Sequence, residues 1–287
     1  MKNKYAIATV CIVSVIIFLL ISQRTLDVFF ANYTSPRLSN STIYGSGCPE
    51  NPFHKRLETL FRTWVSIATR RNLTYFVCYG ALLGLHRDGD VIPFDNDLDV
   101  CIFRNELYKL EMEDEPKPFK ADDGRTHLIY QRHCHHPKID TPRKTCKGFE
   151  VTTNVDQCTF LDPCARIVLR PPTSERTTWL DVFALRDNDS YLLDDWKRKT
   201  HKRAIIFPLK PCVFIGIQTV CPNNITGYLT RYYGNDFATK SHYVCKNEEW
   251  IANTDDAKQI AVPRCPENDL FCKANVFIRG IKNKIKY

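Results

Sequence analysis

The chain has 287 residues, of which 44% are hydrophobic and 25% charged, and its formal net charge is +8. This length supports one large domain with a sizeable core, and the composition excludes disordered, collagen-like and polytopic membrane proteins. The lysines and arginines are spread along the chain, with no basic run that alternates with aromatic residues. We therefore expect no nucleic-acid partner, and the mild positive charge suits a phosphate-bearing substrate.

The first predicted element is a membrane anchor. Residues 5–22 (YAIATVCIVSVIIFLLIS) form an uncharged, mostly apolar run, which as a helix would reach roughly 27 Å. Lys2 and Lys4 precede the run, so the positive-inside rule places residues 1–4 in the cytosol and predicts a type II topology. A cleaved signal peptide is the alternative, although its apolar core is usually only about 7–15 residues long.

Cysteines and glycosylation sequons indicate that the body lies in the lumen of the Golgi or the endoplasmic reticulum. Cys11 lies in the apolar run, and the other twelve of the 13 cysteines follow it, which is typical of an oxidising compartment. Cys78 and Cys101 lie in apolar, strand-like runs, where buried free thiols are an alternative to disulfides. The Asn-x-Ser/Thr sequons also follow the run, and they begin at Asn32, Asn40, Asn72, Asn188 and Asn224.

The remainder of the chain divides into a stem and a body. Residues 23–50 carry proline, serine and two sequons without an apolar period and predict a glycosylated stem, whereas residues 51–287 predict the lumenal domain. The region 105–147 is polar and predicts an insertion with little core, within a Cys-rich insertion near 105–165. The elements expected in chain order are a helix over 53–71, a strand over 73–79, a short helix over 81–86, strands over 98–103, 165–169, 179–185 and 213–220, and a helix that follows an Asn223 or Asn224 cap and ends at Gly234.

Acidic residues gather in the strand expected over 98–103. Leu98, Val100 and Ile102 alternate on one face, so Asp97 and Asp99 share the other, with Cα atoms roughly 6–7 Å apart. Two carboxylates aimed at one point repel each other unless a cation lies between them. Hard oxygen ligands without nearby His or Cys favour Mg²⁺ or Mn²⁺. A solvated acidic turn is the alternative interpretation of this short motif.

Two further features place phosphate chemistry beside these carboxylates. Gly80 lies at a predicted strand-to-helix junction, where the lack of a Cβ lets a phosphate approach the N–H groups of the helix start. Asp181 lies in a separate apolar strand, where a buried carboxylate is costly unless a charge or a metal partners it. An acid on an edge strand is the alternative for Asp181.

The sequence resembles the LicD family of phosphotransferases, which includes fukutin and its relatives. The specific block runs from Tyr79-Gly80-Ala-Leu-Leu-Gly84 to Asp95-Asn-Asp97-Leu-Asp99. Trp179-Leu-Asp181-Val-Phe and Tyr228-Leu-Thr-Arg-Tyr-Tyr-Gly are also similar, so that the resemblance spans roughly residues 55–240. It implies a single catalytic domain with a nucleotidyltransferase-like α/β fold, in which a mixed sheet is flanked by helices.

The resemblance also implies a reaction and a set of site residues. The reaction is metal-dependent transfer of a substituted phosphate, such as ribitol phosphate or phosphocholine, from a CDP-linked donor to a hydroxyl of a glycan or glycoprotein acceptor. By position, the implied metal ligands are Asp97, Asp99 and Asp181, which together with Asp95 form the catalytic cluster, and the implied donor-phosphate contacts are Gly80, Ala81 and Arg87.

Alternatives stay open at this point for three features. The segment His133-Cys134-His135-His136 with Cys146, Cys158 and Cys164 predicts either a zinc site or disulfides. The basic cluster 197–203 predicts either a solvated helix face or a contact with phosphate or an acidic glycan. The rival functions are a metal-dependent Golgi glycosyltransferase that uses a UDP-sugar and a non-catalytic scaffold for glycan enzymes.

Overall fold

The computed structural model describes residues 43–111, 125–134, 141–159, 162–169 and 178–253, which fall into two compact units. The larger unit spans residues 50–238, and the smaller one combines residues 43–49 with 239–253. The predicted anchor at 5–22 and the sequons at Asn32 and Asn40 lie outside the described residues. Within the described ranges, none of the helices has the length and apolar character that crossing a bilayer requires.

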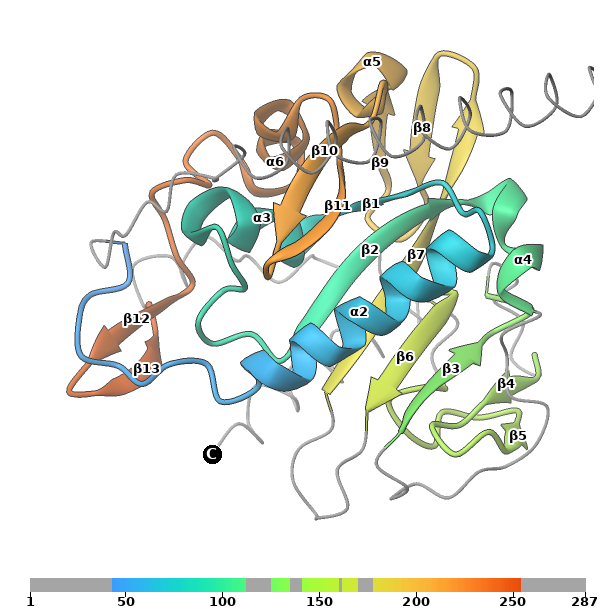
Figure 1. The fold of residues 1–287 in the computed structure, drawn as a ribbon, viewed down its shortest axis with the longest axis horizontal. Helices are drawn as coiled ribbons and strands as arrows, with labels where there is room; N and C mark the ends of the chain where they lie inside the picture. The colour runs from blue at the N-terminus through green and yellow to red at the C-terminus, as the bar shows by residue number, and fades with distance from the viewer. Residues whose placement is uncertain (1–42, 112–124, 135–140, 160–161, 170–177, 254–287) are drawn as a thin grey trace, which may run out of the picture. The chain divides into compact units, whose positions relative to one another are not determined.

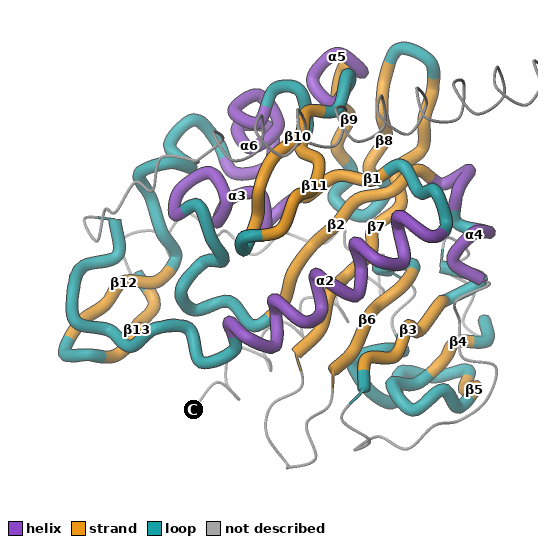
Figure 2. The backbone as a smooth tube through the Cα atoms, viewed as in Figure 1, coloured by secondary structure: helices purple, strands orange, loops and turns teal. Residues whose placement is uncertain are grey.

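A mixed sheet organises the larger unit (Figure 2). Its spatial order is β1 (Tyr75–Val77), β2 (Asp97–Phe103), β7 (Thr178–Asn188), β6 (Ala165–Leu169) and β3 (Thr126–Tyr130). β2 and β7 are parallel, whereas the other neighbours are antiparallel. The far end of β7 also pairs with β8 (Tyr191–Asp194), which pairs with β9 (Lys199–Lys202). The mixed α/β class expected from the sequence is therefore confirmed.

One face of the sheet is covered by α2 (His54–Arg70), which Figure 1 shows lying across β2, β7 and β6. Leu57, Leu60, Phe61 and Trp64 recur at helical spacing and are fully buried, so this stripe drives the packing. The Trp64 ring meets the ring of Tyr75 edge-on at 5.4 Å between centroids. The helix predicted over 53–71 is confirmed.

The opposite face carries α3 (Tyr79–Asp88) and α6 (Ile225–Tyr233). Phe76 of β1 points to this side and meets Tyr228 edge-on at 5.7 Å. The side chain of Asn224 accepts a hydrogen bond from the Gly227 N–H at 2.7 Å, which caps the first turn of α6. The predicted cap and the end of this helix at Gly234 are confirmed.

Three predictions made from the sequence are wrong. The run 213–220 is not one strand: β10 (Lys210–Phe214) and β11 (Ile217–Cys221) form a hairpin, with positive φ values at its turn residues Ile215 and Gly216. The region 105–147 does contribute to the core, because β3 is almost fully buried. The basic cluster does not form a helix face, because residues 197–202 lie on the β8–β9 hairpin and only Arg203 begins a helix. Short elements complete the unit, namely η1 (Arg104–Glu106), α4 (Tyr108–Glu111), β4 (Arg143–Lys144), β5 (Glu150–Val151) and α5 (Arg203–Ile206).

Ten cysteines of the described residues form five disulfides, which suggests a lumenal or secreted protein. The pairs are Cys48–Cys245, Cys78–Cys101, Cys134–Cys164, Cys146–Cys158 and Cys212–Cys221. The alternative of free thiols at Cys78 and Cys101 is therefore wrong. The Cys78–Cys101 disulfide closes a loop with a sequence separation of 23. By the chain-entropy model, this disulfide contributes about 3 kcal/mol to the free energy of unfolding. Cys265 and Cys272 lie outside the described residues.

The disulfides also show whether the cysteines of the Cys-rich segment could bind zinc. Cys146, Asp156 and Cys158 lie close enough together for a metal ion, but the two sulfur atoms are bonded to each other and neither is a thiolate. The Asp156 carboxylate instead accepts backbone N–H bonds from Cys146 at 2.8 Å and Cys158 at 3.0 Å. In this segment the prediction of disulfides is confirmed, and the zinc alternative is wrong for its four cysteines.

The smaller unit is a hairpin of β12 (Tyr243–Lys246) and β13 (Glu249–Ala252). The disulfide between Cys48 and Cys245 ties residues 43–49 to this hairpin. The ring of Tyr44 packs edge-on against Trp250 at 5.9 Å. The disulfide, this aromatic pair and a hydrogen bond from the Cys245 N–H to the Tyr44 carbonyl oxygen therefore join residues 43–49 to the hairpin.

Candidate active site

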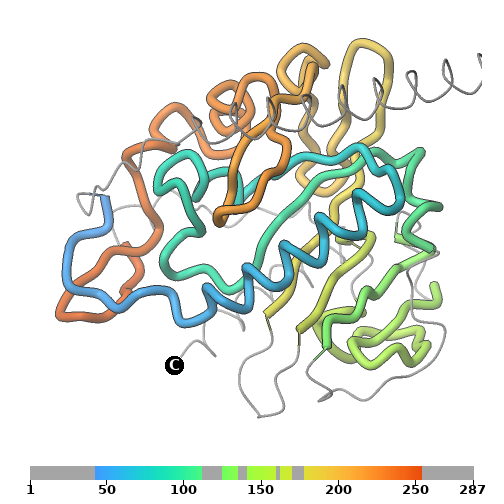
Figure 3. The backbone as a smooth tube through the Cα atoms, viewed as in Figure 1, coloured from blue at the N-terminus to red at the C-terminus, as the bar shows by residue number. Residues whose placement is uncertain are grey.

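The candidate site forms where β2 and β7 run side by side, although about 80 residues separate them in sequence (Figure 3). Their register places Asp99 opposite Asp181 and Asp97 opposite Trp179. Residues in register on neighbouring strands point to the same face, and alternation puts Asp97 on the same side as Asp99. The structure thus brings the three predicted carboxylates together on the face opposite α2.

Gly80 explains how the carboxylates approach the helix start. A Cβ at this position would lie 3.2 Å from Asp99 Oδ2 and 3.5 Å from Asp95 Oδ2. The Gly80 N–H donates to Asp99 Oδ2 at 3.0 Å. The glycine therefore makes room for two carboxylates, and its N–H is already used by one of them. The predicted contacts of Gly80 and Ala81 with a donor phosphate stay predictions.

Negative charge accumulates around Asp99. Burial, together with the charges of Asp97, Asp181 and Asp95, raises the pKa of Asp99 well above its usual range. The Lys197 ammonium acts in the opposite direction on this pKa. A divalent cation would relieve the remaining repulsion. The carboxylates of Asp95, Asp97 and Asp99 therefore fit the hard oxygen ligand set of Mg²⁺ or Mn²⁺.

Asp181 has a protein partner that the sequence analysis did not identify. Arg166 of β6 donates through Nε to Oδ1 at 2.5 Å and through Nη2 to Oδ2 at 2.9 Å, and both side chains are buried. Its guanidinium lies 4.9 Å from the ring centroid of Trp179. The alternative of an edge-strand acid is wrong, because β7 is the central strand. The assignment of Asp181 to the metal stays a prediction.

Arg87 and Tyr233 border the carboxylates from α3 and α6. Arg87 is 7% exposed, and its Nε donates to the carbonyl oxygen of Phe237 at 2.7 Å. Burial and the nearby charges of Asp99 and Asp95 raise the pKa of Tyr233, and Arg87 opposes this shift. Arg87 thus fixes the chain after α6 beside the site, and its predicted contact with a donor phosphate stays a prediction.

The buried carboxylate of Asp194, on β8, holds the start of α3 in place. Asp194 Oδ2 accepts hydrogen bonds from the hydroxyls of Tyr79 and Tyr232, each at 2.6 Å. Burial, and with it the charge of Asp194, raises the pKa of both tyrosines. Tyr79 has a φ of +43°, a conformation that an aromatic residue rarely adopts and that costs about 1–3 kcal/mol. The Asp194 bond therefore helps to hold the backbone that aims Gly80 at Asp99.

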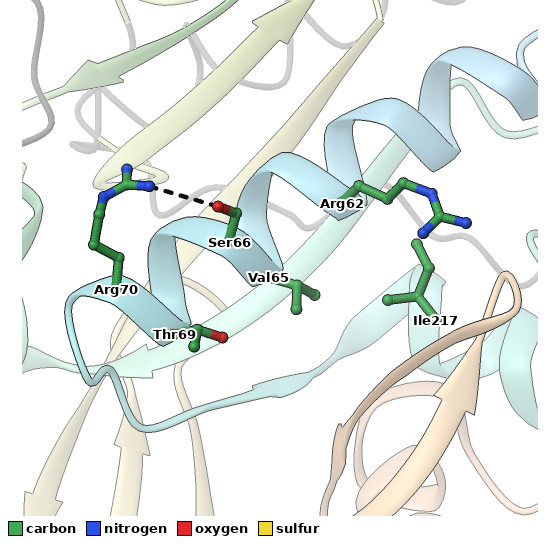
Figure 4. A pocket seen from close by; sticks show the side chains of 6 residues that line it. All are labelled: Arg62, Val65, Ser66, Thr69, Arg70 and Ile217. Atoms are coloured by element: carbon green, nitrogen blue, oxygen red, sulfur yellow. Dashed lines mark hydrogen bonds between the residues drawn. The ribbon is translucent and has the colours of Figure 1, made fainter. Parts of the chain in front are cut away.

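A hollow of about 560 Å³ lies elsewhere, along α2 (Figure 4). Arg62, Ser66 and Arg70 line it on the helix, and Ile217 lines it from β11. Arg62 is already held by Glu58 at 2.8 Å and Arg70 by Ser66 at 3.5 Å. This hollow is on the α2 side of the sheet, away from the carboxylates, so the predicted chemistry does not involve it.

Comparison with known proteins agrees with this geometry. A family profile described as LicD/FKTN/FKRP, nucleotidyltransferase domain, matches residues 72–224. The matched range contains β1, α3, β2, β7 and the carboxylates of the candidate site. A search of curated proteins finds no match.

Proposed function

Because the chain belongs to the LicD family, which suggests a phosphotransferase-like transferase, we propose a specific reaction for it. The protein transfers a substituted phosphate, such as ribitol phosphate or phosphocholine, from a CDP-activated donor to a glycan hydroxyl. The observation that supports this proposal most directly is the gathering of Asp95 and Asp99 around Gly80, with Asp97 and Asp181 on the same face. Such a site suits a diphosphate with a divalent cation.

Asp95, Asp97 and Asp99 are the residues that would hold Mg²⁺ or Mn²⁺, which when bound neutralises charge on the donor diphosphate. The Gly80 N–H fixes Asp99, and Arg166 fixes Asp181 on the neighbouring strand. In the transfer, the acceptor oxygen bonds to the phosphorus that carries the alcohol. The bond from that phosphorus to the bridging oxygen breaks, CMP leaves with the electron pair, and the proton of the acceptor hydroxyl passes to water.

The test of this function is a comparison of donors with the purified full chain. With water as the acceptor, we expect CDP-ribitol or CDP-choline to be hydrolysed to CMP and the phosphoalcohol in the presence of Mg²⁺, and EDTA to stop the release. A glycosyltransferase would instead release UDP from a UDP-sugar and leave both CDP-linked donors intact. A scaffold would release neither nucleotide, so the three candidate functions give different products.

For the location, we propose a type II protein of the Golgi or endoplasmic reticulum, with residues 5–22 as its anchor and the catalytic domain in the lumen. The five disulfides support an oxidising compartment. The sequon asparagines Asn72, Asn188 and Asn224 are exposed, as glycosylation requires. We expect glycosidase to lower the apparent mass of the cell-expressed protein, and added protease to leave the body intact in sealed microsomes. Digestion of the body in sealed microsomes would refute the lumenal location.

A further inference from the structure

The turn between β8 and β9, residues 195–198, presents an aromatic ring and an ammonium group to solvent. Trp196 is 41% exposed, and Lys197 is also exposed. Two anchors hold the turn in place. Asp194 Oδ1 accepts the backbone N–H of Lys197 at 2.9 Å, and Arg186 donates to both carboxylate oxygens of Asp195 at 2.6 and 2.8 Å. The turn is therefore a fixed element of the surface.

This turn lies at the border of the carboxylate site. The ring of Trp196 lies 6.2 Å from that of Phe183, which follows Asp181 by two residues and shares its face of β7. Lys197 Nζ lies 5.5 Å from the ring centroid of Tyr79, the residue before Gly80, and 5.7 Å from that of Trp196. The ammonium thus lies near the ring of Tyr79, which precedes Gly80, and near the ring of Trp196, which packs beside Phe183.

The negative charge of the site favours a cationic side chain near the donor phosphates. A nucleoside diphosphate adds negative charge to a face that already carries four carboxylates, so a cationic side chain beside the phosphates would stabilise the bound donor. Arg166 is buried against Asp181, and Arg87 is buried against the Phe237 carbonyl. Lys197 is exposed on a turn beside the rings of Tyr79 and Trp196, and its charge acts on Asp99. Its position suits a phosphate that arrives from solvent.

We propose that Lys197 binds the phosphate groups of the nucleoside diphosphate donor and that the exposed ring of Trp196 stacks on the base of the same molecule. The assignment rests on the proposed function. Lys197 contributes a point charge on a flexible stem, which follows the diphosphate as the donor binds. Trp196 contributes a flat apolar surface, backed by Phe183, of the kind on which bases stack.

The experiment measures binding of CDP with Mg²⁺ to the purified full chain by calorimetry. We expect K197M to weaken CDP binding at least about tenfold and K197R to stay within about threefold of the wild type. Lys202 is an exposed lysine on the same hairpin, so K202M is the matched control and should bind CDP as the wild type does. Unphosphorylated cytidine should bind equally to the wild type and to K197M, whereas W196A should weaken both ligands.

The outcomes separate this inference from the proposed function. If the wild type binds CDP and K197M binds it equally well, the assignment of Lys197 is wrong while the proposed function stands. If the wild type neither binds CDP nor releases CMP, the proposed function is wrong and the Lys197 assignment falls with it. Melting curves show whether each variant is folded. K197Q, which keeps a polar side chain over Tyr79, replaces K197M if that variant unfolds.

Discussion

Asp99→Asn is expected to lower transfer at least about 10²-fold and at the same time to raise the melting temperature of the metal-free protein. The amide oxygen still accepts the Gly80 N–H bond, so the local fold is retained. The substitution removes the charge whose repulsion with Asp97, Asp181 and Asp95 raises the pKa of Asp99. Loss of activity and gain of stability then have the same electrostatic cause, as expected for a residue selected for function.

The pH dependence of unfolding gives this prediction a second measurement. Because the folded pKa is raised, protonated Asp99 stabilises the fold fully below its unfolded pKa of about 4, and this contribution is lost as the pH rises through the folded pKa. The stability gain of Asp99→Asn in EDTA should therefore be larger at neutral pH than at pH 4. Asp189→Asn, at an exposed turn, is the control and should change neither quantity. Full activity of Asp99→Asn would contradict the metal site.

Local patterns were sufficient for the elements that carry the carboxylates. Alternation along 98–103 predicted that Asp97 and Asp99 share a face, because side-chain direction in a strand follows from sequence parity. The strand, glycine and helix order around Gly80 followed from short-range signals in the same way. These features depend on neighbours within a few residues, and such neighbours are visible in a single sequence.

Contacts between residues that lie far apart in the sequence could not be predicted from those local patterns. Arg166 lies 15 residues before Asp181, and only the antiparallel register of β6 and β7 brings the two side chains into contact. A signal was present, since Arg166 is the one charged residue in the apolar run 165–169, and a charge in a buried strand needs a partner. The hairpin over 210–221 was missed because Ile215 adopts a positive φ that β-branched residues rarely take. The Cys78–Cys101 bond likewise depends on the pairing of β1 with β2.

The strongest effect on stability is expected from Arg166→Met. Removing the guanidinium leaves Asp181 buried without its partner and beside Asp99, which should lower the free energy of unfolding by about 3–5 kcal/mol. Chemical denaturation measures the loss. Arg203 pairs with Asp187 where both side chains are partly exposed, so Arg203→Met is the matched control and should cost no more than about 1 kcal/mol. If Arg166→Met and Arg203→Met lose the same free energy of unfolding, the claim that burial makes the Arg166–Asp181 pair more important is wrong.

The double variant Arg166→Met with Asp181→Asn then decides what Asp181 does. Removing both charges should recover much of the stability lost in Arg166→Met, because neither group is left buried and unpaired. If Asp181 serves only to balance Arg166, transfer should recover together with the fold. If Asp181 takes part in the site, as its register with Asp99 indicates, the fold should recover while CMP release stays low. We expect the second result, and recovery of CMP release to the wild-type rate would remove Asp181 from the active site.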